Sequence, residues 1–147
     1  EVKLSLKDSA GSLLDERTTT FHLGICLGEI TAFSAVPAYF DVGDTINTSL
    51  SFRNSGTEVI SGTAVIQVQN EQGGVVEDFR HGIPDLEPEG SVRFDDGWET
   101  WGLEEGTWAI IGYVLYDSMA TDPRTALVST SLPEERVYLP AICKPFR

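Results

Sequence analysis

The sequence predicts an all-β fold, an antiparallel β-sandwich of about seven to nine strands with an extra β-hairpin at its N-terminus. Several segments alternate apolar and polar residues with the two-residue period of a half-buried strand. Clusters of Gly, Pro, Asn and Asp separate these segments, as turns do in sandwiches. Apolar residues at helical spacing with caps are absent from the 147 residues. A chain of this length, 41% hydrophobic, can bury a core of its own as one domain.

The clearest strand is "TINTSLSFRN" at residues 45–54. Its even-numbered positions form one face of the strand, which we expect to be buried: Ile46, Thr48, Leu50 and Phe52. The segment "TAVIQVQ" at 63–69 repeats the pattern, with Ala64, Ile66 and Val68 facing inward. The Gly-rich "NEQGG" then leads into "VVEDF", so the sequence predicts a β-hairpin across residues 70–74.

The second half of the chain supplies the remaining strands. The segment "SVRF" at 91–94 places Val92 and Phe94 on one face. The segment "TWAIIGYVLY" at 107–116 is apolar on both faces, which predicts a central strand whose two sides are covered. The final "RVYLPAICKPFR" contains two prolines, which cannot donate to a sheet, so we expect an edge strand or a linker there.

The turn motifs resemble those of a known family, the CARDB type of immunoglobulin-like domain. In that family a Gly-Asp turn opens a strand that ends in Asn-x-Gly, and a Leu-x-x-Gly turn precedes a later strand. The residues at those positions, the last of them one residue later than the pattern, are Gly43, Asp44, Asn54, Gly56, Leu86 and Gly90. The resemblance covers residues 28 to about 131 and implies an immunoglobulin-like sandwich of a bacterial or archaeal surface or secreted protein. Related modules serve as stalks, spacers and binding domains, so the fold alone assigns no activity.

The chain divides into an N-terminal hairpin at residues 1–27 and the sandwich at 28–147. The front segment "LSLKDSAGSLLDERTTTFHLGIC" parallels "YVLYDSMATDPRTALVSTSLPEERVYLPAIC" near the end. Each has an apolar strand, Asp-Ser, a turn, a Thr/Ser-rich strand and Ile-Cys, with the Asp-Ser pairs 117 − 8 = 109 residues apart. The parallel predicts that residues 1–27 end a preceding repeat of a tandem array; the alternative is coincidence between short β-rich segments.

An isolated two-stranded hairpin is marginally stable in water and leaves both of its edges unpaired. We therefore expect the N-terminal hairpin to dock. It would either extend a sheet of residues 28–147 or add to an edge of a neighbouring molecule, which would form a homodimer.

The charge balance limits the partners. With 23 acidic and 10 basic residues the formal charge is −13, which disfavours nucleic acid and anionic membrane surfaces as partners. The sequence has no apolar run of about 18 to 20 residues, so we expect no membrane insertion. There is no leader sequence and no initiator Met, and we expect a mature or excised piece of an exported or cell-surface protein.

The two cysteines, Cys26 and Cys143, allow two interpretations. A disulfide between them would close a long loop and stabilise an exported protein. The repeat alignment, however, places each cysteine at the same site of its own copy, which favours two unpaired thiols. Both interpretations remain open from the sequence.

Two groups of residues are candidate ligand sites. Asp95, Asp96 and Glu99 lie in an acid-rich stretch that could bind calcium, although the spacing is not that of a known calcium loop and solvated loops explain it as well. Trp98 and Trp101 lie in the same stretch and could stack on sugar rings, with core packing as the alternative. No other cofactor is expected.

Catalysis has no support in the sequence. The only histidines are His22 and His81, and neither has the spacing to cysteine that a catalytic pair or a zinc site requires. Phosphate loops and nucleophile elbows are also absent. We predict a non-enzymatic structural or adhesive module, a spacer or stalk with protein or glycan partners. The alternatives are a carbohydrate-binding module appended to a secreted hydrolase and, third, an inhibitor or peptide binder that uses an edge strand.

Overall fold

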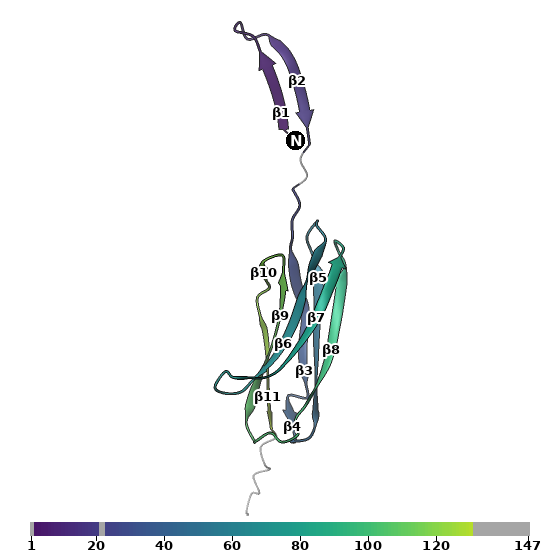
Figure 1. Cartoon of the computed structure of the whole chain (residues 1–147), viewed down its shortest axis with the longest axis vertical. Helices are drawn as coiled ribbons and strands as arrows, with labels where there is room; N and C mark the ends of the chain where they lie inside the picture. Colours follow the sequence, from purple (N-terminus) through teal and green to yellow (C-terminus); the bar gives the residue numbers. More distant parts are fainter. Residues whose placement is uncertain (1, 21–22, 131–147) are drawn as a thin grey trace, which may run out of the picture.

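The computed structural model describes residues 2–20 and 23–130, and its regular structure is entirely β (Figure 1). A hairpin of β1 (Val2–Lys7) and β2 (Leu13–Thr19) comes first. One sheet of the sandwich has the order β3 (Gly28–Val36), β5 (Thr45–Asn54), β8 (Ser91–Glu99). The other has the order β4 (Tyr39–Phe40), β11 (Arg124–Thr130), β9 (Thr107–Tyr116), β6 (Ile60–Gln69), β7 (Val75–Leu86), and the short β10 (Met119–Ala120) pairs with β9. None of the described residues forms a helix that could cross a membrane.

The predicted sandwich is confirmed, and the alternation of its strands is the cause. In β5 the side chains of Ile46, Leu50 and Phe52 are fully buried between the sheets, while the odd-numbered residues are exposed or half-buried. β9 is the central strand of its sheet, paired with β6 on one side and β11 on the other, as its two apolar faces predicted. All pairings in the sandwich are antiparallel except that of β11 with β4.

The motif residues of the family resemblance meet at one place. The Asn54 side chain donates from Nδ2 to the carbonyls of Glu58 (2.7 Å) and Leu86 (2.8 Å), and its Oδ1 accepts from the backbone N–H of Gly56 (3.0 Å). The backbone N–H of Asn54 donates to the carbonyl of Gly90 (2.9 Å). Asn54 is fully buried, so it ties the end of β5 to the loop between β7 and β8. These residues therefore have a structural role.

The N-terminal hairpin lies apart from the sandwich (Figure 1). β1 pairs with β2 alone, and no described residue of either strand pairs with the sandwich. For residues 28–130 the prediction that the hairpin extends a sheet of the sandwich is wrong, because no described residue there pairs with either edge of the hairpin. Hydrogen bonds to the sandwich begin after the hairpin, where the N–H groups of Thr57 and Ser55 donate to the carbonyls of Ile25 and Leu27 (both 2.8 Å).

The chain passes from one end of the sandwich to the other. β3 begins at Gly28, beside the end of β5, and the last described residue, Thr130, pairs with Phe40 at the opposite end (Figure 1). A strand of nine residues spans about 30 Å. The predicted C-terminal edge strand or linker lies in residues 131–147, outside the described residues.

Candidate functional site

The indole of Trp101 is exposed (75%). It lies at the end of the sandwich where β11 ends. The ring lies on Gly43, where an added Cβ would be 2.8 Å from the indole Cζ3, and the φ of +105° at this residue also favours glycine. The turn at Gly43 is fixed by Thr100, whose buried hydroxyl accepts from the Gly43 N–H (2.9 Å) and donates to the Asp44 carbonyl (2.6 Å). Trp101 is therefore supported on a rigid turn while most of its surface faces solvent.

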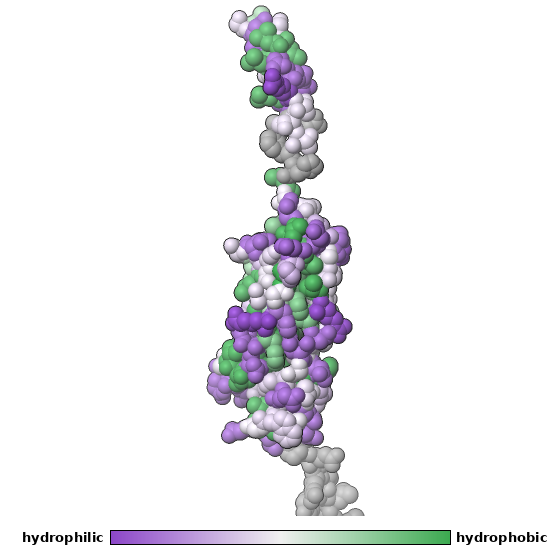
Figure 2. Space-filling model, turned by 45° about the vertical axis from the view of Figure 1, so that its right-hand side comes forward, coloured by the Kyte–Doolittle hydropathy of each residue, from purple (hydrophilic) through white to green (hydrophobic). Residues whose placement is uncertain are grey.

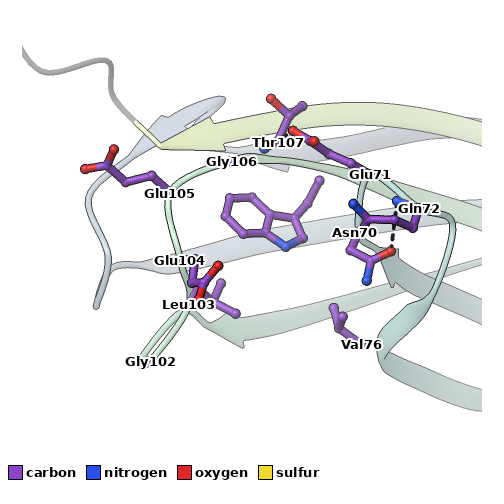
Figure 3. Close-up of a pocket in the computed structure, with 11 residues that line it drawn as sticks. Asn70, Glu71, Gln72, Val76, Gly102, Leu103, Glu104, Glu105, Gly106 and Thr107 are labelled. Atoms are coloured by element: carbon purple, nitrogen blue, oxygen red, sulfur yellow. Dashed lines mark hydrogen bonds between the residues drawn. The ribbon is translucent and has the colours of Figure 1, made fainter.

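A cavity of about 370 Å³ lies beside the loop that follows Trp101 (Figure 3). Its walls come from the β6–β7 turn and the β8–β9 loop, and they carry three carboxylates and two amides over an apolar floor. The residues that line the cavity include Asn70, Glu71, Gln72, Glu104, Glu105 and Trp108. Among the described residues no basic side chain lines the cavity, which disfavours anionic ligands.

The wall of this cavity is held by local hydrogen bonds. The Asn70 Oδ1 accepts from the N–H groups of Gln72 (3.1 Å) and Gly74 (2.8 Å), which shapes the turn (Figure 3). The Glu71 carboxylate accepts from the N–H of Thr107 (3.4 Å) and so joins the turn to β9. Trp108 is only 7% exposed, so little of its indole is open to a ligand, and the cavity offers mainly polar groups.

Trp98 does not share the exposure of Trp101. It is 4% exposed and packs in the core, with its ring centroid 5.9 Å from that of Trp108 and 6.2 Å from that of Phe40. The prediction that Trp98 forms an exposed sugar platform is therefore wrong, because strand alternation in β8 turns its side chain inward. Trp101 alone of the two can stack on a ligand.

Asp95 faces outward from β8 and is bound by a neighbour on the same strand. Its carboxylate accepts from Nε and Nη2 of Arg93 (3.0 and 2.8 Å). Hydrogen bonds from Arg93 and Ser49 lower the pKa of the Asp95 carboxyl below its usual range. Asp95 is thus an ionised carboxylate in an exposed ion pair.

The other two carboxylates proposed for calcium have partners of their own. Asp96 binds Nε2 of His81 (2.8 Å), and Glu99 accepts from the hydroxyl of Thr45 (3.0 Å). Asp95 and Asp96 are consecutive in a strand and point to opposite faces. In the described part of the chain no three His, Cys, Asp or Glu side chains are grouped closely enough to hold a metal ion. The structure does not bring Asp95, Asp96 and Glu99 together as a calcium site.

The pair of His81 and Asp96 joins the two sheets and was not anticipated from the sequence. His81 lies on β7 and Asp96 on β8, and the imidazole also stacks on the Phe94 ring (centroids 4.7 Å apart, planes at 9°). The two residues are 15 positions apart on strands of different sheets, so no local pattern could have paired them. With Asp96 and Phe94 as its neighbours, His81 has a structural role.

Cys26 is half-buried near the start of the sandwich. Burial raises the pKa of its thiol, and the Asp117 carboxylate raises it further. The thiol is therefore protonated at neutral pH and is a poor nucleophile. Cys143 lies outside the described residues, as does His22, so neither interpretation of the two cysteines, a disulfide or two unpaired thiols, is tested.

Comparisons with known proteins support the fold. No family model matches the sequence, and no curated protein matches it. A cycloisomaltooligosaccharide glucanotransferase from Paenibacillus is structurally similar (TM-score 0.58, 13% identity), over 74% of this chain and 15% of that enzyme. The C-terminal domain of Wzt is similar over 76% of this chain and 77% of that domain (TM-score 0.56, 8% identity). The chain thus spans a small part of the enzyme but most of the Wzt domain.

These similarities define the class of this protein as an immunoglobulin-like β-sandwich. The low identities show the fold alone. A CARDB domain from Pyrococcus furiosus also aligns, over 76% of this chain and 97% of that domain (17% identity), but its TM-score of 0.49 is too low to support an argument. The CARDB resemblance therefore rests on the sequence motifs.

Proposed function

We propose that this chain is a non-catalytic module that spaces or joins other parts of an exported or cell-surface protein. The observation that carries the proposal is the path of the chain, which runs from Gly28 at one end of the sandwich to Thr130 at the other. Domains joined in series through such a module are held apart by its full length. A sandwich with a continuous buried core is stiff enough for this role.

The chemistry of the described polar residues agrees with a role outside catalysis. His81 is bound to Asp96 and stacked on Phe94, and the Cys26 thiol is protonated. The remaining carboxylates of β8 are held in separate contacts. These contacts support structural roles for the side chains and are in keeping with the proposal.

Distance measurement tests the spacer proposal. Spin labels at Glu29→Cys and Val42→Cys, both exposed, mark the two ends of the sandwich in a chain whose own cysteines are replaced by serine. We expect one narrow distance distribution centred at about 30 Å. A broad distribution, or one that changes when a glycan or calcium is added, would contradict a rigid spacer.

A second candidate function, a carbohydrate-binding module, is favoured by Trp101. An exposed indole held on a rigid turn is the kind of surface that stacks on sugar rings, and the glutamates and amides of the nearby cavity can accept or donate hydrogen bonds to hydroxyl groups. The similar Paenibacillus enzyme is named as a glucanotransferase solved with a cyclic sugar, and that name is a reason to test neutral glucans first.

Titration with neutral oligosaccharides, followed by calorimetry and tryptophan fluorescence, tests this candidate. Binding that is lost in Trp101→Ala and retained in Tyr39→Ala would support a platform at Trp101; Tyr39 is the matched control because it is also an exposed aromatic (70%) at this end. Binding equal in both variants, or none in the parent chain, counts against the glycan function and leaves the spacer proposal standing.

A further inference from the structure

The N-terminal hairpin exposes apolar side chains that a stable sheet would cover. Leu4 (73% exposed) and Leu6 (62% exposed) project from alternate positions of β1, so they share one face of the hairpin. In Figure 2 apolar surface is visible over the hairpin. The opposite face carries the ion pair of Lys3 with Glu16. Arg17 and Asp15, which pair with Leu4 and Leu6, lie on the same face as the leucines and form an ion pair there. Within the described part of the chain, nothing covers the two leucines.

A second hairpin of the same chain, formed by β9 and β11, shares a sequence motif with the β1–β2 hairpin. Asp-x-Arg-Thr occurs at residues 15–18, within β2, and at residues 122–125, which lead into β11. In each hairpin the Arg of this motif lies opposite a residue of the first strand: Arg17 pairs with Leu4, and Arg124 pairs with Gly112. Strand register thus aligns Leu4 with Gly112, and Leu6 with Val114.

The equivalent face of the second hairpin is buried, and the structure shows what buries it. Val114 is fully buried, and a Cβ at Gly112 would lie 2.5 Å from the Phe33 ring and 2.9 Å from the Leu50 Cδ1. Phe33 and Leu50 belong to β3 and β5 of the opposite sheet. The face that holds Leu4 and Leu6 is therefore the face that a three-stranded sheet covers in a complete sandwich.

We propose that the β1–β2 hairpin is the closing hairpin of another sandwich of this kind, which precedes it in the same protein and covers Leu4 and Leu6 with its three-stranded sheet. The sandwich of residues 28–130 cannot supply that sheet, because its own inner face is filled by β9 and β11. A second copy of the chain has the same filled face. This inference rests on the proposed function, that of a module joined in series with other domains. It adds that the domain before the hairpin is a sandwich of the same kind.

In the proposed arrangement the outer edges of the hairpin also gain partners. In the sandwich β9 pairs with β6 and β11 pairs with β4, so the closing hairpin has a strand on each side. β1 and β2 would be paired in the same way. In the register alignment Leu4 and Gly112 are 112 − 4 = 108 residues apart, which is about the length of one such sandwich with its connection.

Hydrogen exchange tests this inference on the natural protein. Amide exchange of β1 and β2 is compared between residues 1–147 and a chain extended by about 110 residues toward the natural N-terminus. We expect exchange in the hairpin to slow by about a hundredfold or more in the longer chain, as its amides join a global unfolding unit. Equal exchange in the two chains, or an upstream sequence without alternating strands, would overturn the proposal.

Paired variants of the longer chain identify the face involved. Leu4→Asp with Leu6→Asp should remove the added protection and lower the melting temperature of the upstream sandwich, while Thr18→Asp, on the opposite face beside Lys3, should change neither. If protection of the hairpin in residues 1–147 instead rises with protein concentration, a second copy covers it and the proposal fails. The end-to-end distance of residues 28–130 should be the same in every case, so the spacer proposal is tested separately.

Discussion

β1 and β5 both alternate apolar with polar residues, yet the leucines of β1 are exposed while the apolar side chains of β5 are buried. Leu50 of β5 has no exposed surface, whereas Leu6 of β1 is 62% exposed. The local pattern is the same in both, and the difference is the second sheet that covers β5. Alternation therefore determines that a strand forms and which face is apolar, but the burial of that face depends on a partner that can be distant in the chain or outside it.

The largest difference between the two strands is expected when leucine is replaced by alanine in each of them. Leu50→Ala should lower the free energy of unfolding of the sandwich by about 2 to 5 kcal/mol, because it leaves a cavity in the core. Leu6→Ala should change it by less than about 0.5 kcal/mol, because its side chain contributes nothing to the core. Urea unfolding followed by tryptophan fluorescence measures both values, and equal losses would contradict the separation of the two regions.

A smaller loss of stability is expected when the buried side chain of Asn54, at the end of β5, is removed. Asn54→Ala should lower stability by about 2 to 3 kcal/mol, since the carbonyl of Leu86 and the N–H of Gly56 lose their buried partner. Asn47→Ala, on the exposed face of the same strand, is the control and should be neutral. The same urea titration applies, and a neutral Asn54→Ala would mean that water replaces the side chain.

The smallest effect concerns the surface of β8. Because Arg93 and Ser49 lower the pKa of Asp95 in the folded chain, this ion pair stabilises the fold above the ordinary carboxyl pKa of about 3.9 and loses that effect as the pH falls through the lower folded value. Asp95→Asn should therefore reduce stability slightly at pH 6 and not at pH 2. Carboxyl NMR titration of Arg93→Gln should show the Asp95 pKa moving up; an unmoved pKa would show that Arg93 has no influence.

The sequence allowed prediction of the strands and their faces, because alternation in segments such as 45–54 is a local property. It also predicted the turn at Gly43, where the φ is positive. It did not predict that Trp98 is buried while Trp101 is exposed, because that depends on where β8 ends and on the turn beneath Trp101. Nor could it find the contact of His81 with Asp96, which requires the two sheets to be stacked.

The central claim, that the sandwich is complete without the hairpin, is tested most directly by melting a chain that begins at Leu23. This truncation removes β1 and β2 and keeps the carbonyls of Ile25 and Leu27 that bond to the sandwich. We expect the melting temperature of the truncated chain to lie within about 1 °C of that of residues 1–147. A fall of about 4 °C or more, equivalent to roughly 1 kcal/mol for a domain near 100 residues, would show that the hairpin stabilises this sandwich and would contradict the account.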